Sequence, residues 1–280
     1  MGQVACMSFQ PPLEDGAVDI IFKAQRGLKY DDAELSKRSG VSVETIDSFR
    51  KSSRADESIL RALSETLELN ATAVLAIARA TYSPEPIRVI EGLRAFNTPF
   101  DDMTVNSYLL WDPETLDAAF FDTGSDGQGM LDAASERGLA VKTIFLTHTH
   151  TDHIYDLDRL IEKTGAKAWV GDREPLTGAD TFAAGRKFSI GWLKVETRLT
   201  CGHSKGGITY VIKGLSQPVA IVGDAVFAGS MGGGMVSFED ALRTNRSEIM
   251  TLPNNTILCP GHGPMTTVAE QRVFNPFLAV

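Results

Sequence analysis

The chain has 280 residues, of which 43% are hydrophobic and 22% are charged, and its formal net charge at pH 7 is −9. This length and composition are those of an ordinary globular protein with room for one large domain, or for a large and a smaller one. The negative balance argues against nucleic-acid binding by the chain as a whole, and no apolar run approaches the about 20 residues that span a bilayer, so no membrane partner is expected.

The first residues of the chain and its cysteine content predict in which cellular compartment the protein is found. The first ten residues carry no basic side chain and lead into no apolar core, so no secretory signal is expected. Three cysteines, an odd number without framework spacing, favour a reducing environment, and the expected location is the cytoplasm. Cys201 and Cys259 are interpreted as small buried residues, with a redox or ligand role as the alternative.

Residues 22–83 are predicted to form an all-α domain after an N-terminal extension, residues 1–21. Helix caps and apolar residues at helical spacing predict five helices, at 22–28, 33–39, 43–52, 58–69 and 71–80. The second and third are joined through Gly40, which makes a helix-turn-helix. Two prolines, Pro84 and Pro86, end the helical pattern, so residues 84–280 are assigned to a second domain.

The helical domain resembles two known families. The lambda-repressor-like helix-turn-helix family is matched in register by Leu35, Gly40, Val41, Ile46 and Phe49. Residues 60–77 are similar to the N-terminal domain of cyanase, a resemblance that implies assembly. The presumed recognition helix mixes Glu44 and Asp47 with Arg50 and Lys51, whereas phosphate contact favours excess positive charge. We therefore expect a homo-oligomer formed through this domain, with DNA binding as the less favoured alternative.

From residue 87 onward, short strands alternate with helices. Strands are expected at 105–111, 118–122, 143–147, 167–170, 193–199, 207–213, 219–222 and 256–259. Helices are expected at 129–137, 153–163, 238–250 and 267–274. The order is mixed α/β without the repeated βαβ unit of a barrel.

All five histidines fall in one constellation that follows these strands. His148, His150 and His153 lie just after the strand at 143–147, and His203 and His262 each follow a glycine. Neutral imidazole is the commonest protein ligand for first-row metals. Because one catalytic metal takes roughly three protein ligands and a water, the four candidate ligands between His148 and His153, including Asp152, predict two metals.

With Asp224 at the end of the strand at 219–222, these residues closely resemble the metallo-β-lactamase superfamily, over about residues 87–280. The resemblance implies a four-layer αββα fold. It also implies two ligand sets bridged by Asp224: His148, His150 and His203 on one metal, and Asp152, His153 and His262 on the other.

Two divalent ions roughly 3.5 to 4 Å apart can share a water and lower its pKa enough to supply hydroxide at neutral pH. Zinc is the expected ion, with iron or manganese as alternatives. Since every histidine is committed as a ligand, proton transfer falls to Asp152, Asp224 or solvent, and these two aspartates are the predicted catalytic residues. Asp122 is interpreted as orienting a ligand or its loop, with a turn-forming aspartate as the alternative.

Within the superfamily, the better likeness is to the glyoxalase II (hydroxyacylglutathione hydrolase) branch, carried by residues 223–230, 258–264 and 275–278. It implies hydrolysis of a small-molecule thioester. Residues 231–235 and Tyr155 depart from that branch's usual motifs. Together with Lys205 they are the expected substrate lining, with ordinary loop residues as the alternative.

Two alternatives to the hydrolase stay open. A persulfide dioxygenase would use one iron on the residues that match His148, His203 and Asp224. A DNA-binding regulator would use the metal domain as a metabolite sensor.

Overall fold

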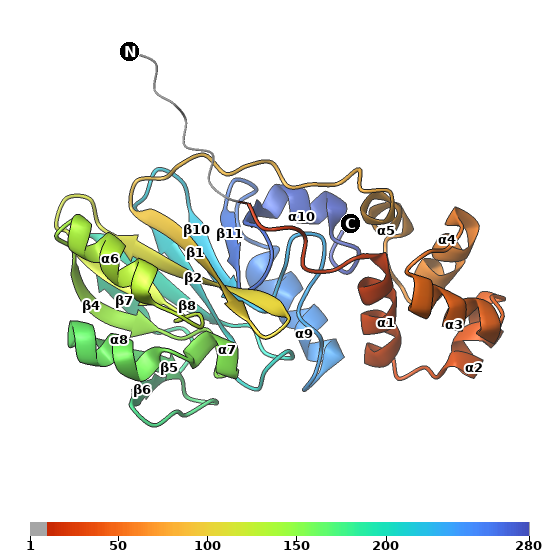
Figure 1. Cartoon of the computed structure of the whole chain (residues 1–280), viewed down its shortest axis with the longest axis horizontal. Coiled ribbons are helices and arrows are strands. Elements are labelled where there is room, and N and C mark those ends of the chain that lie inside the picture. The colour runs from red at the N-terminus through yellow and green to blue at the C-terminus, as the bar shows by residue number, and fades with distance from the viewer. Residues whose placement is uncertain (1–9, 280) are drawn as a thin grey trace, which may run out of the picture.

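The computed structural model describes residues 10–279 and contains a group of N-terminal helices packed beside two sheets (Figure 1). The helices are α1 (Ala17–Gly27), α2 (Asp32–Ser39), α3 (Val43–Ser52), α4 (Glu57–Thr66) and α5 (Ala71–Ala78). Side chains of Asp31, Ser42 and Asn70 accept hydrogen bonds from backbone N–H groups in the first turns of α2, α3 and α5. These caps satisfy donors that a helix start leaves without a partner.

Helix α1 is longer than predicted. It starts at Ala17, inside the predicted N-terminal extension, rather than at residue 22. Ile20 and Ile21 have no exposed surface, because they face the rest of the protein and not solvent. Gly40 follows α2 in the left-handed region (φ 71°), which glycine adopts without strain, so α2 and α3 form the predicted helix, turn and helix. The resemblance to DNA-binding and cyanase domains remains a prediction.

Two six-stranded sheets form the rest of the structure. The first has the order β1-β2-β3-β4-β5-β6 and the second β12-β11-β10-β9-β8-β7. The strands of the first are β1 (Leu93–Phe100), β2 (Met103–Trp111), β3 (Asp117–Phe121), β4 (Ala140–Phe145), β5 (Lys167–Gly171) and β6 (Ala179–Phe182). Those of the second are β7 (Lys187–Ile190), β8 (Leu193–Leu199), β9 (Ile208–Lys213), β10 (Val219–Gly223), β11 (Ile257–Pro260) and β12 (Thr266–Thr267).

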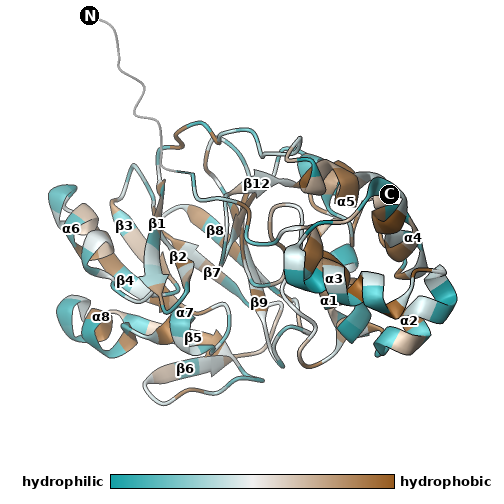
Figure 2. Cartoon of the chain, turned by 45° about the vertical axis from the view of Figure 1, so that its right-hand side comes forward, coloured by the Kyte–Doolittle hydropathy of each residue, from teal (hydrophilic) through white to brown (hydrophobic). Residues whose placement is uncertain are grey.

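Helices cover the outer face of each sheet. They are α6 (Gln128–Glu136), α7 (Thr151–Ile154), α8 (Leu157–Thr164), α9 (Phe238–Thr244), which continues into a π-helical turn (Asn245–Ile249), and α10 (Val268–Phe274). Buried residues of α6 and α8 pack on the first sheet, and a separate apolar cluster lies between the two sheets. Hydrophilic residues line the outward turns of α6 and α8 (Figure 2). This mixed α/β arrangement with two sheets agrees with the predicted metallo-β-lactamase fold.

Several elements differ from the sequence prediction. The strands β1, β6, β7 and β12 were not expected. The edge strand β1 shows no regular apolar alternation, and β6, β7 and β12 have four, four and two residues, which is too short for a pattern to stand out. The helix expected at 153–163 is interrupted at Asp156, whose backbone N–H donates to Thr123 Oγ1 instead of a helix carbonyl. The helix expected at 238–250 ends as a π-helical turn.

The N-terminal helices share one apolar core with the second sheet. Buried residues of α1 to α5 form a continuous cluster with Val222, Val226 and Leu258. Tyr82 stacks on Phe274 of α10 with ring centroids 4.6 Å apart. The two parts are therefore a single packed body. No helix among residues 10–279 is long and apolar enough to cross a membrane.

Candidate metal centre

The predicted site residues meet at one edge of the two sheets, where strands end. His148 and His150 follow β4, and Asp152 and His153 lie in the first turn of α7. The other three lie in the segments after β8, β10 and β11: His203, Asp224 and His262. Because β3, β4 and β5 are parallel to one another, as are β10 and β11, their carboxyl ends bring these segments together.

The side chains form two groups of possible metal ligands. His148, His150, His203 and Asp224 each offer an atom within 4.8 Å of the others, and so do Asp152, His153 and His262. In the first group, His150 Nδ1 lies 3.0 Å from the Nε2 atoms of both His148 and His203. In the second, Asp152 Oδ2 lies 3.3 Å from His153 Nε2 and 3.2 Å from His262 Nε2.

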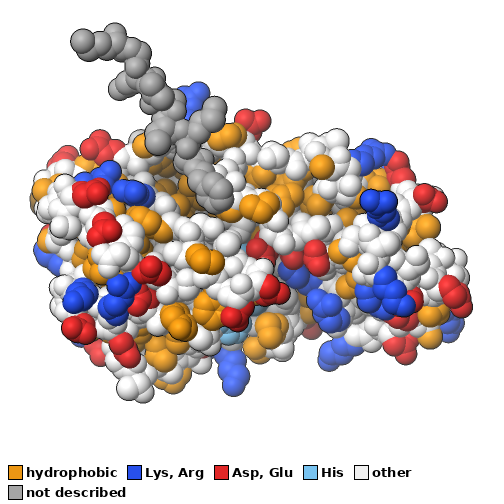
Figure 3. Space-filling model, viewed as in Figure 1, with side chains coloured by type: hydrophobic (Ala, Val, Ile, Leu, Met, Phe, Trp, Pro, Cys, Tyr) orange, Lys and Arg blue, Asp and Glu red, His pale blue; other side chains and the backbone are white. Residues whose placement is uncertain are grey.

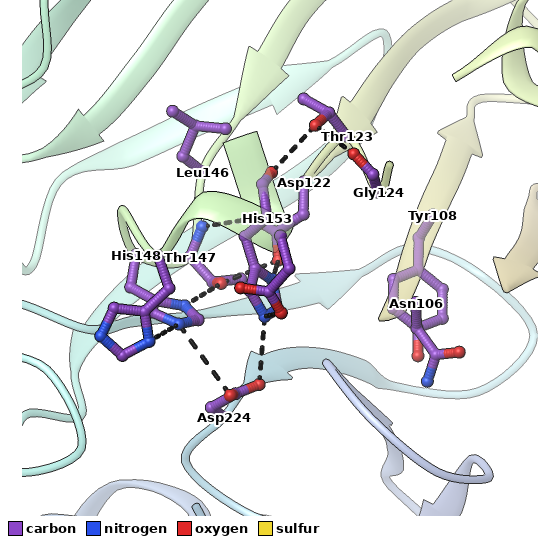
Figure 4. A network of polar contacts seen from close by, with 12 residues as sticks. Asn106, Tyr108, Asp122, Thr123, Gly124, Leu146, Thr147, His148, His153 and Asp224 are labelled. Atoms are coloured by element: carbon purple, nitrogen blue, oxygen red, sulfur yellow. Dashed lines mark hydrogen bonds and ion pairs between the residues drawn. The ribbon is translucent and has the colours of Figure 1, made fainter. Parts of the chain in front are cut away.

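Asp224, a member of the first group, also contacts the second, and Figure 4 shows its carboxylate facing both His148 and His153. Its Oδ2 is 3.3 Å from His203 Nε2 in the first group and 3.4 Å from His262 Nε2 in the second, and its Oδ1 is 3.3 Å from His153 Nε2. His153 Nε2 and Asp224 Oδ1 are buried without a hydrogen-bond partner. Orphaned buried polar atoms are costly, and a cation between them would satisfy both. The residues present therefore fit a pair of metal ions.

Four histidines direct one nitrogen to the centre and the other to a partner outside it. His153 Nδ1 lies 2.8 Å from Asp122 Oδ2, and His148 Nδ1 lies 3.0 Å from Thr147 Oγ1. Backbone carbonyls take the other two: His203 Nδ1 lies 3.0 Å from the Gly233 oxygen, and His262 Nδ1 lies 2.7 Å from the Thr104 oxygen. Such partners fix the ring orientation and tautomer of a ligating histidine.

Comparison with known proteins agrees with this geometry. A family model described as "Metallo-beta-lactamase superfamily" matches residues 100–262, more than half of the chain. The chain belongs to the metallo-β-lactamase superfamily. The helices α1 to α5 lie outside the matched residues.

Several members of the superfamily are similar to this chain. The probable metallo-hydrolase YqgX of Bacillus subtilis is 33% identical over 208 residues, which cover 64% of this chain and 95% of the relative. The hydroxyacylglutathione hydrolase GloC of Haemophilus influenzae is 26% identical over 198 residues, with 62% of this chain and 92% of the relative covered.

Among solved structures, the B3 metallo-β-lactamase BLEG-1 has a TM-score of 0.57 at 25% identity and covers 67% of this chain and 100% of its own. ETHE1 from Myxococcus xanthus has a TM-score of 0.59 at 24% identity and covers 66% of this chain and 84% of its own, a likeness that shows the fold alone.

The two ligand groups of this superfamily member differ electrostatically. Burial lowers the pKa of His148 well below its usual value and also lowers the pKa of His203. Burial likewise opposes a charge on His153 and His262, but Asp224 outweighs it together with Asp122 beside His153 and Asp152 beside His262, so the pKa of His153 rises to about 10 and that of His262 to about 11. In turn, His262 and His153 overcome the desolvation of Asp224 and hold its pKa well below the usual range.

Asp122 has the predicted orienting role. Its Oδ1 accepts from the Thr147 backbone N–H at 2.7 Å, and its Oδ2 accepts from Thr147 Oγ1 at 2.8 Å as well as from His153 (Figure 4). Asp122 also adopts a left-handed backbone conformation (φ 54°), so it forms a turn in addition to orienting His153. Asp122 therefore couples the histidine run after β4 to the end of β3.

The expected substrate lining is corrected in part. Met231 has no exposed surface and belongs to the apolar core, so it cannot line a substrate site. Met235 and Tyr155 are 76% and 65% exposed, and Lys205 is exposed. Cys201 and Cys259 are buried free cysteines, as interpreted from the sequence, and neither belongs to a ligand group found within residues 10–279.

Glu174 also supports the candidate metal centre, although the sequence did not predict this role. This buried carboxylate accepts from the Thr149 N–H at 2.8 Å and from the Gly206 N–H at 2.7 Å, so it ties the loop of His148 and His150 to the loop of His203. Its hydrogen bonds to Ser204, Gly206 and Thr149 outweigh burial and lower its pKa. In the sequence it stands in a polar turn, and nothing about its neighbours marks it as buried.

Proposed function

We propose that this chain is a dinuclear metal-dependent hydrolase that cleaves a small-molecule thioester. The observation that carries the proposal is the position of Asp224, whose carboxylate lies within 3.4 Å of imidazole nitrogens from both ligand groups. His148, His150 and His203 would hold one ion, Asp152, His153 and His262 would hold the other, and Asp224 would bridge them. Two ions bound there would supply hydroxide at neutral pH and polarise the substrate carbonyl.

The two aspartates of the centre have different surroundings and are proposed to do different things. Asp224 is 8% exposed and lies between four histidines, so it is fixed as an anion. Asp152 is 14% exposed and contacts the two histidines of its own group, which leaves it closer to solvent. We assign Asp152 the transfer of protons between the centre and solvent, because a proton carrier must reach water.

The thioester is supported by two likenesses: the glyoxalase II-type motifs of the sequence and the match to a hydroxyacylglutathione hydrolase at 26% identity. The competing possibility is oxygen chemistry at one iron, since His148, His203 and Asp224 form a set of two histidines and one carboxylate. A single experiment separates the two. The protein, purified without added metal, is analysed for its metals and then assayed with S-lactoylglutathione and with glutathione persulfide.

We expect about two zinc ions per chain and release of free thiol from the thioester, with no oxygen consumption from the persulfide. One iron per chain with oxygen consumption would contradict the hydrolase proposal. Two ions with no thiol release from the glutathione ester or from acyl esters of other thiols would contradict the thioester.

For the N-terminal domain we propose assembly into a homo-oligomer rather than DNA binding. The basic residues of α3 are already paired within the domain: Arg50 lies 2.6 Å from Asp32, and Lys51 lies 2.6 Å from Asp47. Acidic and basic side chains are interspersed over the visible surface of this domain (Figure 3). Phosphate binding requires unpaired positive charge on one face.

Light scattering of the full chain is expected to give a multiple of the monomer mass. A gel-shift assay with mixed-sequence duplex DNA at low salt is expected to show no complex. A monomer that shifts DNA in a salt-dependent way would overturn this proposal and favour a regulator.

A further inference from the structure

The N-terminal domain contacts the loop that follows β10, next to the metal centre. Asp15, just before α1, and Lys23 of α1 form an ion pair and are only 10% and 12% exposed. Lys23 Nζ also donates to the Met231 carbonyl oxygen at 2.7 Å, and Asp15 accepts from the Ser230 hydroxyl. Lys23 and Asp15, which are nearly inaccessible to solvent, therefore each form a hydrogen bond with this loop, at Met231 and Ser230.

Residues 232 and 233 of the same loop form hydrogen bonds with two candidate metal ligands, His203 and Asp224. Gly233 accepts from His203 Nδ1 at 3.0 Å, and the Gly232 N–H donates to the Asp224 backbone carbonyl at 3.1 Å. A Cβ atom on Gly232 would lie 2.0 Å from the Asp224 carbonyl oxygen and 2.8 Å from His203 Nδ1. The loop is thus packed closely against both residues, and a shift of residues 231–233 would displace the carbonyl that accepts from His203 Nδ1.

The second ligand group is contacted in a similar way. Gly263, directly after His262, lies against the backbone of Glu14: a Cβ atom there would be 3.2 Å from the Glu14 nitrogen. Lys23 Nζ lies 5.4 Å from the ring centre of Phe227, and that ring lies 5.7 Å from the ring of His262. The segment before α1, together with α1, touches the loops of both groups.

These contacts come from a part of the chain that the family match, residues 100–262, leaves out. The apolar residues beside them, Ile20, Ile21 and Met231, are wholly buried in one cluster. Loss of Lys23 would leave the Met231 carbonyl and the Asp15 carboxylate without their cation in a nearly dry position, and such groups move to recover partners.

We propose that Lys23, paired with Asp15, is a positioning residue for the metal centre, through which the N-terminal domain sets the orientation of His203 by way of residues 231–233. The proposal rests on the metal binding assumed in the proposed function, but not on the choice of substrate. In this protein the helical domain is then a structural component of the metal centre, in addition to the assembly role proposed above.

The test compares zinc binding by the full-length metal-free protein and its Lys23→Met variant, in competition with a chromophoric chelator. Outer partners of metal ligands contribute about 10- to 100-fold in affinity, and Lys23 acts one step further out, so we expect about a tenfold weaker affinity for one of the two ions. The Co²⁺ absorption spectrum should change as well, since it reports the geometry of the ligands. Lys23→Arg should restore most of the affinity, because it can donate to the same carbonyl.

Lys37→Met is the matched control, since this lysine is exposed on α2 and should leave both readouts unchanged. If Lys23→Met lowers the melting temperature of the metal-free protein while zinc affinity and the Co²⁺ spectrum stay at wild-type values, Lys23 is only structural and the proposal is wrong. Should Lys23→Met not fold, Asp15→Asn takes its place with the same two criteria.

Because no substrate enters these measurements, their failure is distinct from failure of the hydrolase proposal. A wild-type protein that binds two ions but cleaves no thioester would refute the latter alone.

Discussion

Asp224→Ala is expected to lower metal affinity by more than about a hundredfold, above the range for outer partners of metal ligands, and to abolish measurable thioester hydrolysis. The carboxylate lies between both ligand groups, 3.3 Å from His203 Nε2 and His153 Nε2 and 3.4 Å from His262 Nε2. Without it, imidazoles from both groups face one another with no anion between them. Neither ion would keep its full ligand set, and the positions of the two ions would no longer be coupled.

Elemental analysis and thiol release measured on the same preparations test this expectation. Asp158→Ala, which removes an exposed carboxylate from the first turn of α8, is the control and should keep both metal and activity. If Asp224→Ala loses metal yet hydrolyses the thioester at the wild-type rate, the two-metal mechanism is wrong.

Asp122→Asn is expected to weaken metal binding to the second group by about 10- to 100-fold. Asp122 accepts three hydrogen bonds, from the Thr147 N–H, the Thr147 hydroxyl and the His153 ring. An asparagine amide has one accepting oxygen and one donating NH₂ group. In either orientation, the NH₂ group would therefore face at least one N–H or O–H group that also donates a hydrogen. One escape is for His153 to move its proton to Nε2, which then points a hydrogen at the metal position.

The asparagine is the appropriate probe because residue 122 has a left-handed backbone conformation (φ 54°), which asparagine tolerates and alanine does not. We also expect the metal-free protein to lose about 1–3 kcal/mol of stability in urea unfolding, as a buried hydrogen bond is left unmade. Asp158→Asn serves as the control. Unchanged zinc affinity, with or without a loss of stability, would reduce Asp122 to a turn residue.

The sequence alone was sufficient to name the candidate metal ligands that the fold brings together, because four of them come in one short local pattern. Histidine is rare in this chain. Because they lie within six residues of one another, the same strand end positions His148, His150, Asp152 and His153. Helix caps such as Ser42 and Asn70 act within a single turn, so the helices they start were predicted close to their true positions. Edge strands such as β1 carry a weaker pattern and were missed.

Only the tertiary structure decided what surrounds those residues. The partners of His203 and His262 are backbone carbonyls of Gly233 and Thr104, and a carbonyl is the same at every position of a chain. Glu174 reaches Thr149 and Gly206 through contacts between distant segments, as Lys23 reaches Met231. Such contacts depend on how separate elements pack, because each joins residues that local spacing does not relate. The candidate ligands could therefore be predicted from the sequence, whereas their hydrogen-bond partners, and the contacts of Lys23 with the loop beside them, are decided only in the folded chain.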